Sequence, residues 1–517
     1  MKKIFSVLLA CMLAFSMCAA LAEEASLKLT DEPVEFSVWF PFPAEDFGAM
    51  STLNDADVYK WMEEQTNVHI NWIIPATGAE SENFNLLFAA DEMPDIVFNQ
   101  GGKYEYVEGA EAAVEDGYYL ALNDLIDEYA PNYKAVLESD ENIAKDAATD
   151  SGLIWSFYFI YSGGGKGMNC GPIIRKDFLD ACGLDVPTTY DELHTALVAF
   201  KEQLGIPSPL YLNIYGSGWH DEYMSGYGVA QGFYQEDGQV KYGPIEDGYG
   251  EYLDMMRDWF EEGLIYKDFA IGTEEEPSED LVLNDEIGCW VGYATHAGDT
   301  YYPTRGAVNP DFNLVGMKIP GINADDVNHL RMIDTVVNTY SWAITADCEH
   351  PEIAVQWLDI FYNPEYFNLF NYGMREGESY VIDENGQYHW GDLIMHNPDG
   401  LTVNQARCTY TMLNPFYEEY SRVMGSWNED QLAAQNLWRE TEQDWVISSK
   451  LSPTADESRK MSEIMTDITT LVREETVKYI MGTSTYTFDA LRDQIKGMGI
   501  EDAIAIEQVV LDRYNAR

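Results

Sequence analysis

The chain has 517 residues and a formal net charge of −59, with 89 acidic residues against 30 lysines and arginines. A surface this acidic repels phosphates and anionic lipid headgroups. We therefore expect no binding to nucleic acid or to an anionic membrane surface. Hydrophobic residues make up 46% of the chain and aromatic residues 13%, which excludes a largely disordered protein. A chain of this length is too long for one core, so it predicts two lobes.

The first residues have the order of a secretory signal peptide. Lys2 and Lys3 precede an apolar run that ends on small residues at Ala22, directly before two glutamates. We expect residues 1–22 to be the signal peptide and the protein to be exported. The alternative is a lipoprotein, because the segment Leu8–Cys11 resembles a cleavage box in which Cys11 becomes the lipid-bearing first residue. No second run of eighteen apolar residues follows, so we expect no membrane span in the mature chain.

Five cysteines remain beyond the signal. An odd count at wide spacing, without a Cys-x-x-Cys pair, predicts neither a disulfide framework nor a zinc site. We expect buried small apolar residues at these positions, which are Cys170, Cys182, Cys289, Cys348 and Cys408.

The first hundred residues alternate strand and helix patterns. In chain order they predict a strand, a helix, a strand, a helix and a short buried strand, over Val34–Phe40, Asp55–Thr66, Val68–Ile74, Ser81–Ala90 and Asp95–Phe98. This alternation predicts a parallel sheet covered on both faces and an α/β fold. Ligands of such sheets lie beyond the carboxyl ends of the strands, so the loops Trp39–Pro41 and Asn99–Gly102 are candidate site segments.

The rest of the chain is mostly helical, with two hairpins. Asp237-Gly238 and Asn385-Gly386 each stand between short β patterns and predict tight turns. Thr189 and Glu192 have capping-box spacing at a helix start. The predicted helices are 122–137, Ile174–Cys182, Tyr190–Leu204, Tyr249–Glu262, Pro351–Tyr362, Glu457–Ile480 and Glu501–Tyr514.

Signatures of catalysis and of cofactor binding are missing. The chain has neither a His-Glu-x-x-His nor a Gly-x-Ser-x-Gly motif. The glycines of Gly163–Gly167 lack the spacing of a phosphate loop, and Asp383–Gly386 fits a tight turn better than a calcium loop. The eight histidines show no metal-ligand spacing on one helix. We therefore expect no enzyme, no metal and no cofactor, although paired carboxylates for glycoside cleavage remain an alternative.

Aromatic residues recur at predicted strand ends and in loops. A pyranose ring packs its apolar face on an aromatic ring, and its hydroxyls need polar partners. Aromatic residues interleaved with short polar ones therefore fit a sugar-binding cleft. Tryptophans at helical core spacing, such as Trp61, Trp259 and Trp357, are explained by packing instead.

Several segments together resemble one family, the family 1 extracellular solute-binding proteins of carbohydrate import systems, in a long form related to lipoprotein- and alginate-binding types. The segments are Phe84–Ile96, Gly171–Leu179, Val186–Leu193, Tyr242–Pro244, Glu262–Ile265, Tyr372–Gly377 and Leu511–Tyr514. The resemblance implies a two-lobed type II periplasmic-binding fold with a ligand cleft between the lobes. It also implies a monomer that captures an oligosaccharide and delivers it to the permease subunits of an ABC-type importer. Many relatives carry a calcium loop where this chain has Gly205–Pro209, which puts a structural calcium in doubt.

Strand-end position and the family pattern together predict the ligand-binding residues. They are Trp39, Asn99, Trp155, Trp219, Trp290, Tyr293, Trp342, Arg375 and Glu376. For Arg175, at a predicted helix start, an ion pair is the simpler expectation. We expect residues 23–160 and 331–410 to form one lobe, and residues 161–330 and 411–517 the other. The alternatives that stay open are a peptide or an anionic uronide as ligand, a polysaccharide-cleaving enzyme, and a sensor subunit.

Overall fold

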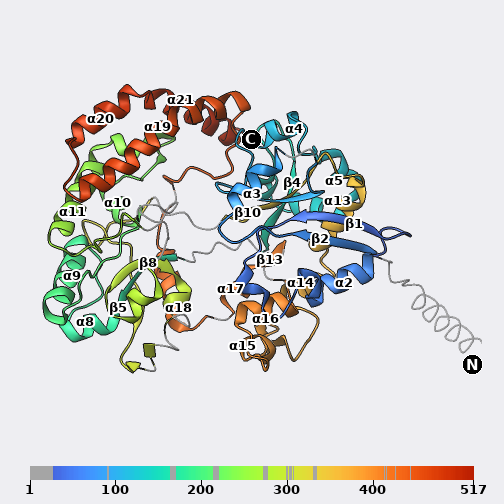
Figure 1. The fold of residues 1–517 in the computed structure, drawn as a ribbon, viewed down its shortest axis with the longest axis horizontal. Helices are drawn as coiled ribbons and strands as arrows, with labels where there is room; N and C mark the ends of the chain where they lie inside the picture. The colour runs from blue at the N-terminus through green and yellow to red at the C-terminus, as the bar shows by residue number, and fades with distance from the viewer. Residues whose placement is uncertain are drawn as a thin grey trace, which may run out of the picture. The chain divides into compact units, whose positions relative to one another are not determined.

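The computed structural model describes residues 27–89, 92–162, 170–213, 221–271, 277–297, 301, 305–306, 308–329, 335–412, 414, 416–425, 427–442 and 444–517. The predicted signal peptide, the glycine-rich segment Gly163–Gly167 and Trp219 lie outside these residues. Helices and strands alternate over the first hundred residues, whereas only helices follow β13 (Tyr417–Glu419) among the described residues (Figure 1).

The chain folds into two compact units, each built from three chain segments. Unit 1 consists of residues up to Phe98, Tyr118–Val136 and Trp342–Phe416. Unit 2 consists of Asn99–Gly117, Leu137–Ser341 and Tyr417–Arg517. The lobe boundaries expected from the sequence, at residues 160, 330 and 410, stay a prediction.

The largest sheet has six strands in the order β13-β4-β10-β3-β1-β2. The strands are β1 (Val34–Trp39), β2 (Val68–Ile73), β3 (Ile96–Gln100), β4 (Ser156–Ser162), β10 (Val337–Ile344) and β13 (Tyr417–Glu419). β1 pairs in parallel with β2 over its whole length and with β3 at Val38 and Trp39. This pairing confirms the parallel sheet predicted from the alternating pattern.

Two predicted helices of the first half follow the expected ranges, and a third is divided. α2 (Asp57–Thr66) and α3 (Glu80–Leu87) lie where the sequence predicts them. The single helix predicted for 122–137 is wrong in one respect, because the structure has two helices there, α5 (Asn123–Tyr129) and α6 (Pro131–Leu137). Proline lacks an N–H and disfavours helical backbone at the residue before it, so the first helix ends at Tyr129 and the second begins at Pro131.

Unit 2 contains a three-stranded antiparallel sheet with the order β8-β5-β9. The strands are β5 (Cys170–Arg175), β8 (Cys289–Tyr293) and β9 (Leu314–Gly316). The helix predicted from Ile174 is therefore wrong at its start, since Ile174 pairs with Cys289 and Val315 and is fully buried. The helix itself, α8, spans Lys176–Cys182. Apolar residues of a buried strand and of a buried helix look alike over a few positions, which explains the error.

A close approach of a helix to this sheet requires a glycine. α18 (Glu429–Trp438) places the Trp438 indole against β5, and a Cβ atom added to Gly171 would lie 2.4 Å from its ring. No real Cβ contact is that short, so any side chain at Gly171 would push α18 off the sheet.

Arg175 forms the predicted ion pair, in a fully buried position. Arg175 Nη2 lies 2.7 Å from Asp177 Oδ2, and Arg175 Nη1 lies 2.7 Å from Asp285 Oδ1. The guanidinium also stacks over the ring of Phe178 at 3.7 Å. A buried cation is tolerated only when it is paired and hydrogen-bonded, and two carboxylates meet that condition.

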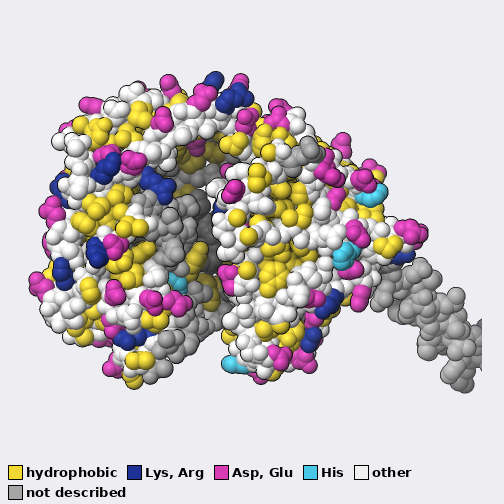
Figure 2. Space-filling model, in the orientation of Figure 1, with side chains coloured by type: hydrophobic (Ala, Val, Ile, Leu, Met, Phe, Trp, Pro, Cys, Tyr) yellow, Lys and Arg dark blue, Asp and Glu magenta, His cyan; other side chains and the backbone are white. Residues whose placement is uncertain are grey.

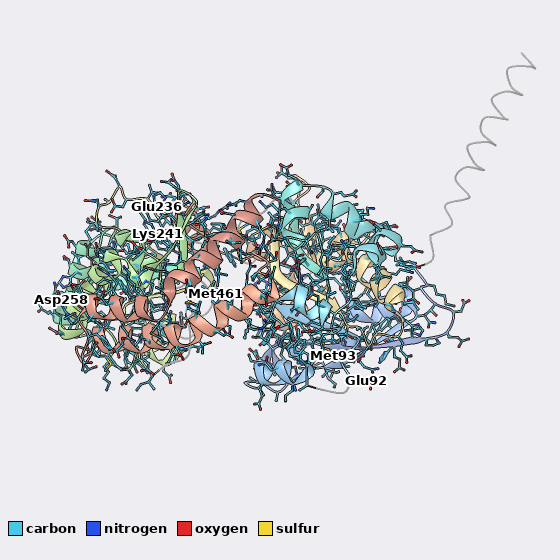
Figure 3. The ribbon with its side chains drawn as sticks, turned by 90° about the horizontal axis from the view of Figure 1, so that it is seen from above. Glu92, Met93, Glu236, Lys241, Asp258 and Met461 are labelled. Carbon is cyan, nitrogen blue, oxygen red and sulfur yellow. The ribbon has the colours of Figure 1, made fainter. Side chains whose placement is uncertain are left out.

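Local capping and turn signals are confirmed. α9 spans Tyr190–Leu204, and Thr189 Oγ1 accepts a hydrogen bond from the Glu192 N–H at 3.2 Å. β6 (Phe233–Glu236) and β7 (Gln239–Tyr242) form the first hairpin, with Asp237 and Gly238 at φ values of 53° and 78°. Glu236 and Lys241 form an ion pair across this hairpin (Figure 3). β11 (Tyr380–Ile382) and β12 (Tyr388–Trp390) form the second hairpin.

The remaining helices complete both units. They are α4 (Ala110–Glu115), α7 (Glu141–Ala147), α10 (Asp221–Met224), α11 (Asp247–Glu261), α12 (Glu279–Leu283), α13 (Pro351–Asp359), α14 (Phe367–Tyr372), α15 (Asp392–Met395), α16 (Val403–Tyr410), α17 (Tyr420–Met424), α19 (Ala455–Ile480), α20 (Phe488–Gly497) and α21 (Ile500–Asn515). α19 and α21 lie side by side (Figure 1), with Ile468 and Val472 packed in one core with Ile500 and Ala503.

The surface carries the acidity of the sequence. Figure 2 shows Asp and Glu side chains spread over the visible face, with fewer Lys and Arg among them. The five cysteines beyond residue 22 are free. Cys289, Cys348 and Cys408 are buried as expected, whereas the expectation of burial is wrong for Cys170 and Cys182, which are partly exposed. None of the helices in the described ranges combines the length and the apolar character that a bilayer crossing requires.

Candidate functional site

The carboxyl end of β3 meets the amino end of β10 in unit 2. The Gly101 N–H donates to the Thr339 carbonyl at 3.2 Å, and the Gln100 N–H donates to the Tyr104 carbonyl at 2.9 Å. Asn99, one of the predicted ligand residues, is the second-last residue of this strand and is 2% exposed. The loop after β3 is thus held beside the first residues of β10, at the edge of the sheet where ligands are expected.

A buried lysine lies at this edge. Lys450 Nζ donates to the Asn338 carbonyl at 2.5 Å and lies 4.3 Å from the centroid of the Tyr158 ring. Burial lowers the pKa of Lys450 to about 7, while the charges of Asp146 and Glu105 act in the opposite direction. A carbonyl and an aromatic face are neutral partners, so they stabilise the ammonium less than a carboxylate contact would.

The half-buried ring of Trp155, another predicted ligand residue, lies next to this lysine site. Its ring meets that of Tyr158 edge to face, with 6.1 Å between the centroids. Trp155, Tyr158, Asn338 and Lys450 together are called the Lys450 cluster below. It combines an indole surface, a phenol and a cation, which are groups that stack on sugar rings and hydrogen-bond to hydroxyls.

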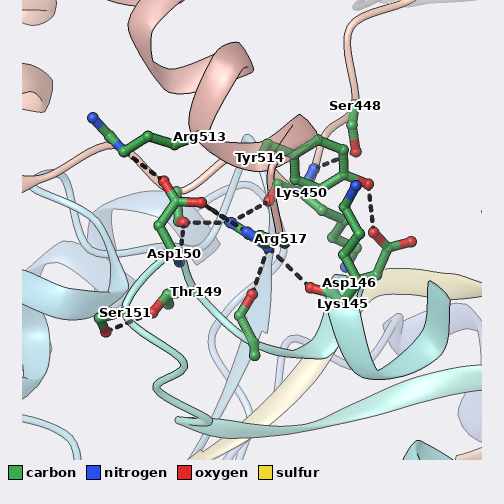
Figure 4. Close-up of polar contacts among 12 residues, drawn as sticks. Lys145, Asp146, Thr149, Asp150, Ser151, Ser448, Lys450, Arg513, Tyr514 and Arg517 are labelled. Carbon is green, nitrogen blue, oxygen red and sulfur yellow. Dashed lines mark hydrogen bonds and ion pairs between the residues drawn. The ribbon is translucent and has the colours of Figure 1, made fainter. Parts of the chain in front are cut away.

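The C-terminus holds the segment that carries Lys450 against the helix α7. Figure 4 shows Arg513 and Arg517 converging on Asp150. Arg513 Nε lies 2.9 Å from Asp150 Oδ2, and Arg517 Nη2 lies 2.7 Å from Asp150 Oδ1. Tyr514 Oη donates to Asp146 Oδ1 at 2.6 Å. The segment Leu511–Tyr514, which carries part of the family resemblance, therefore has a structural role.

Arg513 also anchors the start of α19. Two of its nitrogens donate to the two carboxylate oxygens of Glu457, at 2.7 and 2.6 Å. This two-point contact holds the pKa of Glu457 at about 2, well below the ordinary value.

In unit 1, two predicted ligand residues are core side chains. Trp39 has no exposed surface, and its indole N–H donates to Asn83 Oδ1 at 2.6 Å. Trp342 is 3% exposed and stacks on Phe416, with 5.8 Å between the ring centroids. The Trp342 indole N–H is buried without a hydrogen-bond partner among the described residues. Of these two tryptophans, only Trp342 therefore has an indole N–H that could still donate a hydrogen bond. Leaving such a donor buried and unpaired costs free energy.

Arg375 and Glu376 lie together on the surface of unit 1. Arg375 donates through Nε and Nη2 to Asp57 Oδ2, at 3.0 and 2.7 Å, and its guanidinium lies 4.8 Å from the Tyr410 ring centroid. Glu376 is exposed and bridges to Tyr380. The positive charge of Arg375 is thus already balanced by Asp57.

Two neighbouring predicted residues of unit 2 differ in exposure. Trp290, the second residue of β8, has no exposed surface, and its indole N–H donates to His296 Nδ1 at 3.3 Å. Tyr293, the last residue of the same strand, is 42% exposed. Val291 lies on the same face of β8 as Tyr293 and is buried, so both faces of the strand are covered and only its last residue is exposed. The ligand roles of all the predicted residues stay predictions.

Lys450 and Asn338 are functional candidates that the sequence did not indicate. Lys450 stands in Ser448–Ser452, a polar segment without a motif, and burial is what distinguishes it. Asn338 contributes only its backbone carbonyl, which no residue pattern reveals.

The chain thus has two units, and its sheets combine with helices in a mixed α/β fold. The chain belongs to the bacterial extracellular solute-binding proteins, whose family model matches residues 44–366. It is 23% identical over 511 residues to the fructooligosaccharide ABC transporter substrate-binding protein FusA of Streptococcus pneumoniae, covering 90% of this chain and 88% of that one. It is 26% identical over 376 residues to the lipoprotein LipO of Bacillus subtilis, covering 70% of each chain.

Solved structures share the fold over nearly the whole chain. The alginate-binding protein AlgQ2 without calcium has a TM-score of 0.74 at 21% identity, covering 94% of this chain and 99% of that one. Streptococcus pneumoniae FusA in complex with kestose has a TM-score of 0.71 at 19% identity, covering 94% and 100%. These likenesses confirm the predicted periplasmic-binding fold.

Proposed function

We propose that the chain captures an oligosaccharide outside the cytoplasm and delivers it to an ABC-type importer. The observation that carries this proposal is the similarity to FusA, named for fructooligosaccharides, over 90% of the chain. The chain would act as a receptor without catalysis, exported by residues 1–22 or lipid-anchored at Cys11. Its partners would be permease subunits, and it would act as a monomer.

The Lys450 cluster supports a hydroxyl-rich ligand. Trp155 offers a half-buried aromatic face at a strand edge, next to the polar groups of Tyr158 and Lys450. Stacking on an aromatic ring with hydrogen bonds to the ring hydroxyls is the general chemistry of sugar recognition. A micromolar dissociation constant corresponds to about −8 kcal/mol, which a few such contacts supply.

An acidic oligosaccharide is the second candidate. The chain is 26% identical over 245 residues, 45% of its length, to the polygalacturonan/rhamnogalacturonan-binding protein YtcQ of Bacillus subtilis. Lys450 supplies one cation in the cluster, and a uronate carboxylate next to it would hold it in the charged form. The net charge of −59 opposes an anionic ligand, so we favour a neutral one.

A thermal-shift screen of the mature protein tests both candidates. The panel contains kestose and nystose, neutral milk oligosaccharides, oligogalacturonates, alginate oligomers and peptides, each recovered afterwards and checked by mass spectrometry for cleavage. A ligand at 100 times its dissociation constant stabilises the folded state by about 2.7 kcal/mol, which appears as a raised melting temperature. Stabilisation by an intact neutral oligosaccharide supports the proposal. Stabilisation by uronides alone favours the second candidate, and cleavage or a response only to peptides refutes both.

A further inference from the structure

A histidine and two carboxylates converge in unit 2, far from one another in the sequence. One ligand atom from each of His329, Glu442 and Asp444 lies within 4.8 Å of the other two. His329 Nδ1 is 2.7 Å from Asp444 Oδ1 and 3.7 Å from Glu442 Oε2. The three side chains are 30%, 65% and 55% exposed, so a solvated ion has access to all of them.

We propose that His329, Glu442 and Asp444 bind a divalent transition-metal ion such as Zn²⁺. Zinc takes imidazole and carboxylate ligands at about 2.0–2.2 Å, which places tetrahedral ligand atoms about 3.4 Å from one another. The two distances from His329 Nδ1 lie on either side of that value. An imidazole nitrogen among carboxylates selects zinc, cobalt or nickel over magnesium and calcium, which prefer oxygen ligands.

Backbone pairing holds the ligands in place before any ion arrives. The Glu442 N–H donates to the Asn328 carbonyl at 2.8 Å, and the Trp445 N–H donates to the His329 carbonyl at 3.3 Å. Thr441 Oγ1 donates to the same Asn328 carbonyl at 2.7 Å. The backbone at Asn328 and His329 is thus fastened to the segment that carries both carboxylates.

An aromatic contact also orients the imidazole. The His329 ring stacks on the Trp445 indole, with 4.8 Å between the centroids and an interplanar angle of 22°. Stacking limits rotation of the ring and directs Nδ1 to the carboxylates. Pre-organised ligands lose less entropy on binding, which favours affinity at a site to which the described residues supply three ligands. Water would fill the remaining coordination positions, and the ion would act as a clamp between the two segments.

The site depends on tertiary structure, which is why no metal is expected from the sequence. His329 is more than one hundred positions from Glu442 and Asp444, and no ligand pair shares a helix. The proposal is independent of the sugar-binding proposal, since it involves none of the residues of the Lys450 cluster.

Isothermal titration of the metal-stripped, untagged protein with ZnCl₂ at pH 7.5 tests the site. We expect one saturable site per chain in the wild type, and at least tenfold weaker binding in His329→Gln and in Asp444→Asn. The matched control is His389→Gln. His389 Nε2 lies 3.2 Å from Asp383 Oδ2 on the second hairpin, so this variant also removes a histidine that contacts a carboxylate, away from the proposed site. Its isotherm should equal that of the wild type.

A second readout separates metal binding from a loss of folding. Zn²⁺ should raise the melting temperature of the wild type and of His389→Gln but not that of His329→Gln, while all three have the same circular dichroism spectrum without metal. The proposal is overturned if the wild type shows no saturable site, or if His329→Gln binds Zn²⁺ as tightly as the wild type.

Discussion

Replacing Lys450 by methionine should change how the stability of the protein depends on pH. The ammonium is buried against the Tyr158 ring and the Asn338 carbonyl, and burial lowers its pKa to about 7. In the unfolded chain the lysine has an ordinary pKa of about 10.4. Between these two values the unfolded state binds more protons than the folded state, so the free energy of unfolding rises with pH.

The magnitude follows from the difference between the two pKa values. Each pH unit in this window contributes up to about 1.4 kcal/mol, so the wild type should gain on the order of 2 kcal/mol from pH 7 to pH 9. Methionine keeps most of the buried chain volume and carries no proton, so Lys450→Met should lack this gain. Above about pH 10 ordinary tyrosines begin to titrate, so the comparison ends at pH 9.

Urea unfolding at pH 7, 8 and 9, followed by tryptophan fluorescence, measures the effect for the wild type and Lys450→Met. The matched control is Lys201→Met, because Lys201 is only half-buried and also donates to a backbone carbonyl, that of Gly263, at 3.0 Å. Its curve should run parallel to that of the wild type. The reasoning is refuted if the stability of Lys450→Met rises from pH 7 to pH 9 as steeply as that of the wild type.

Three further predictions follow from the described contacts. Burial raises the pKa of Asp359 to about 6, so the wild type should lose stability from pH 4 to pH 6 while Asp359→Asn does not, as urea unfolding would measure. Arg513 holds the pKa of Glu457 at about 2, so Glu457→Gln should cost about 1–2 kcal/mol at neutral pH, and this cost should vanish as pH falls from 4 towards 2; a constant cost would contradict the ion-pair account. Trp155→Ala should weaken oligosaccharide binding about tenfold by titration calorimetry, whereas Trp61→Ala should not, and equal losses would contradict the placement of the ligand at Trp155.

Short-range patterns determined most of the helices and both hairpins. Thr189 and Glu192 place the start of α9, because a capping hydroxyl needs only the backbone three residues further on. Asp237-Gly238 places the first hairpin turn, because few residues tolerate positive φ at two adjacent positions. The break at Pro131 is equally local, and a closer reading of that proline would have divided the helix predicted for 122–137.

Other features depend on contacts that no local pattern contains. Ile174 continues β5 because two strands pair with it, although its neighbours suit a helix start equally well. Trp290 and Tyr293 stand three residues apart in one aromatic strand, yet one is fully buried and the other 42% exposed. Both faces of β8 are covered, because Cys289 and Val291 pack in one core and Trp290 packs in another, while Tyr293 is the last residue of the strand. Strand periodicity alone does not supply that information.

By itself, the sequence indicated the class of the protein: an acidic α/β solute-binding protein with aromatic residues near predicted strand ends. Only the tertiary structure decided which polar groups lie together. Lys450 gains its lowered pKa from its burial, and His329 meets Glu442 and Asp444 through backbone pairing between distant segments. The physical reason is that burial, ion pairing and ligand geometry are properties of neighbours in space, whereas capping, turns and periodicity are properties of neighbours along the chain.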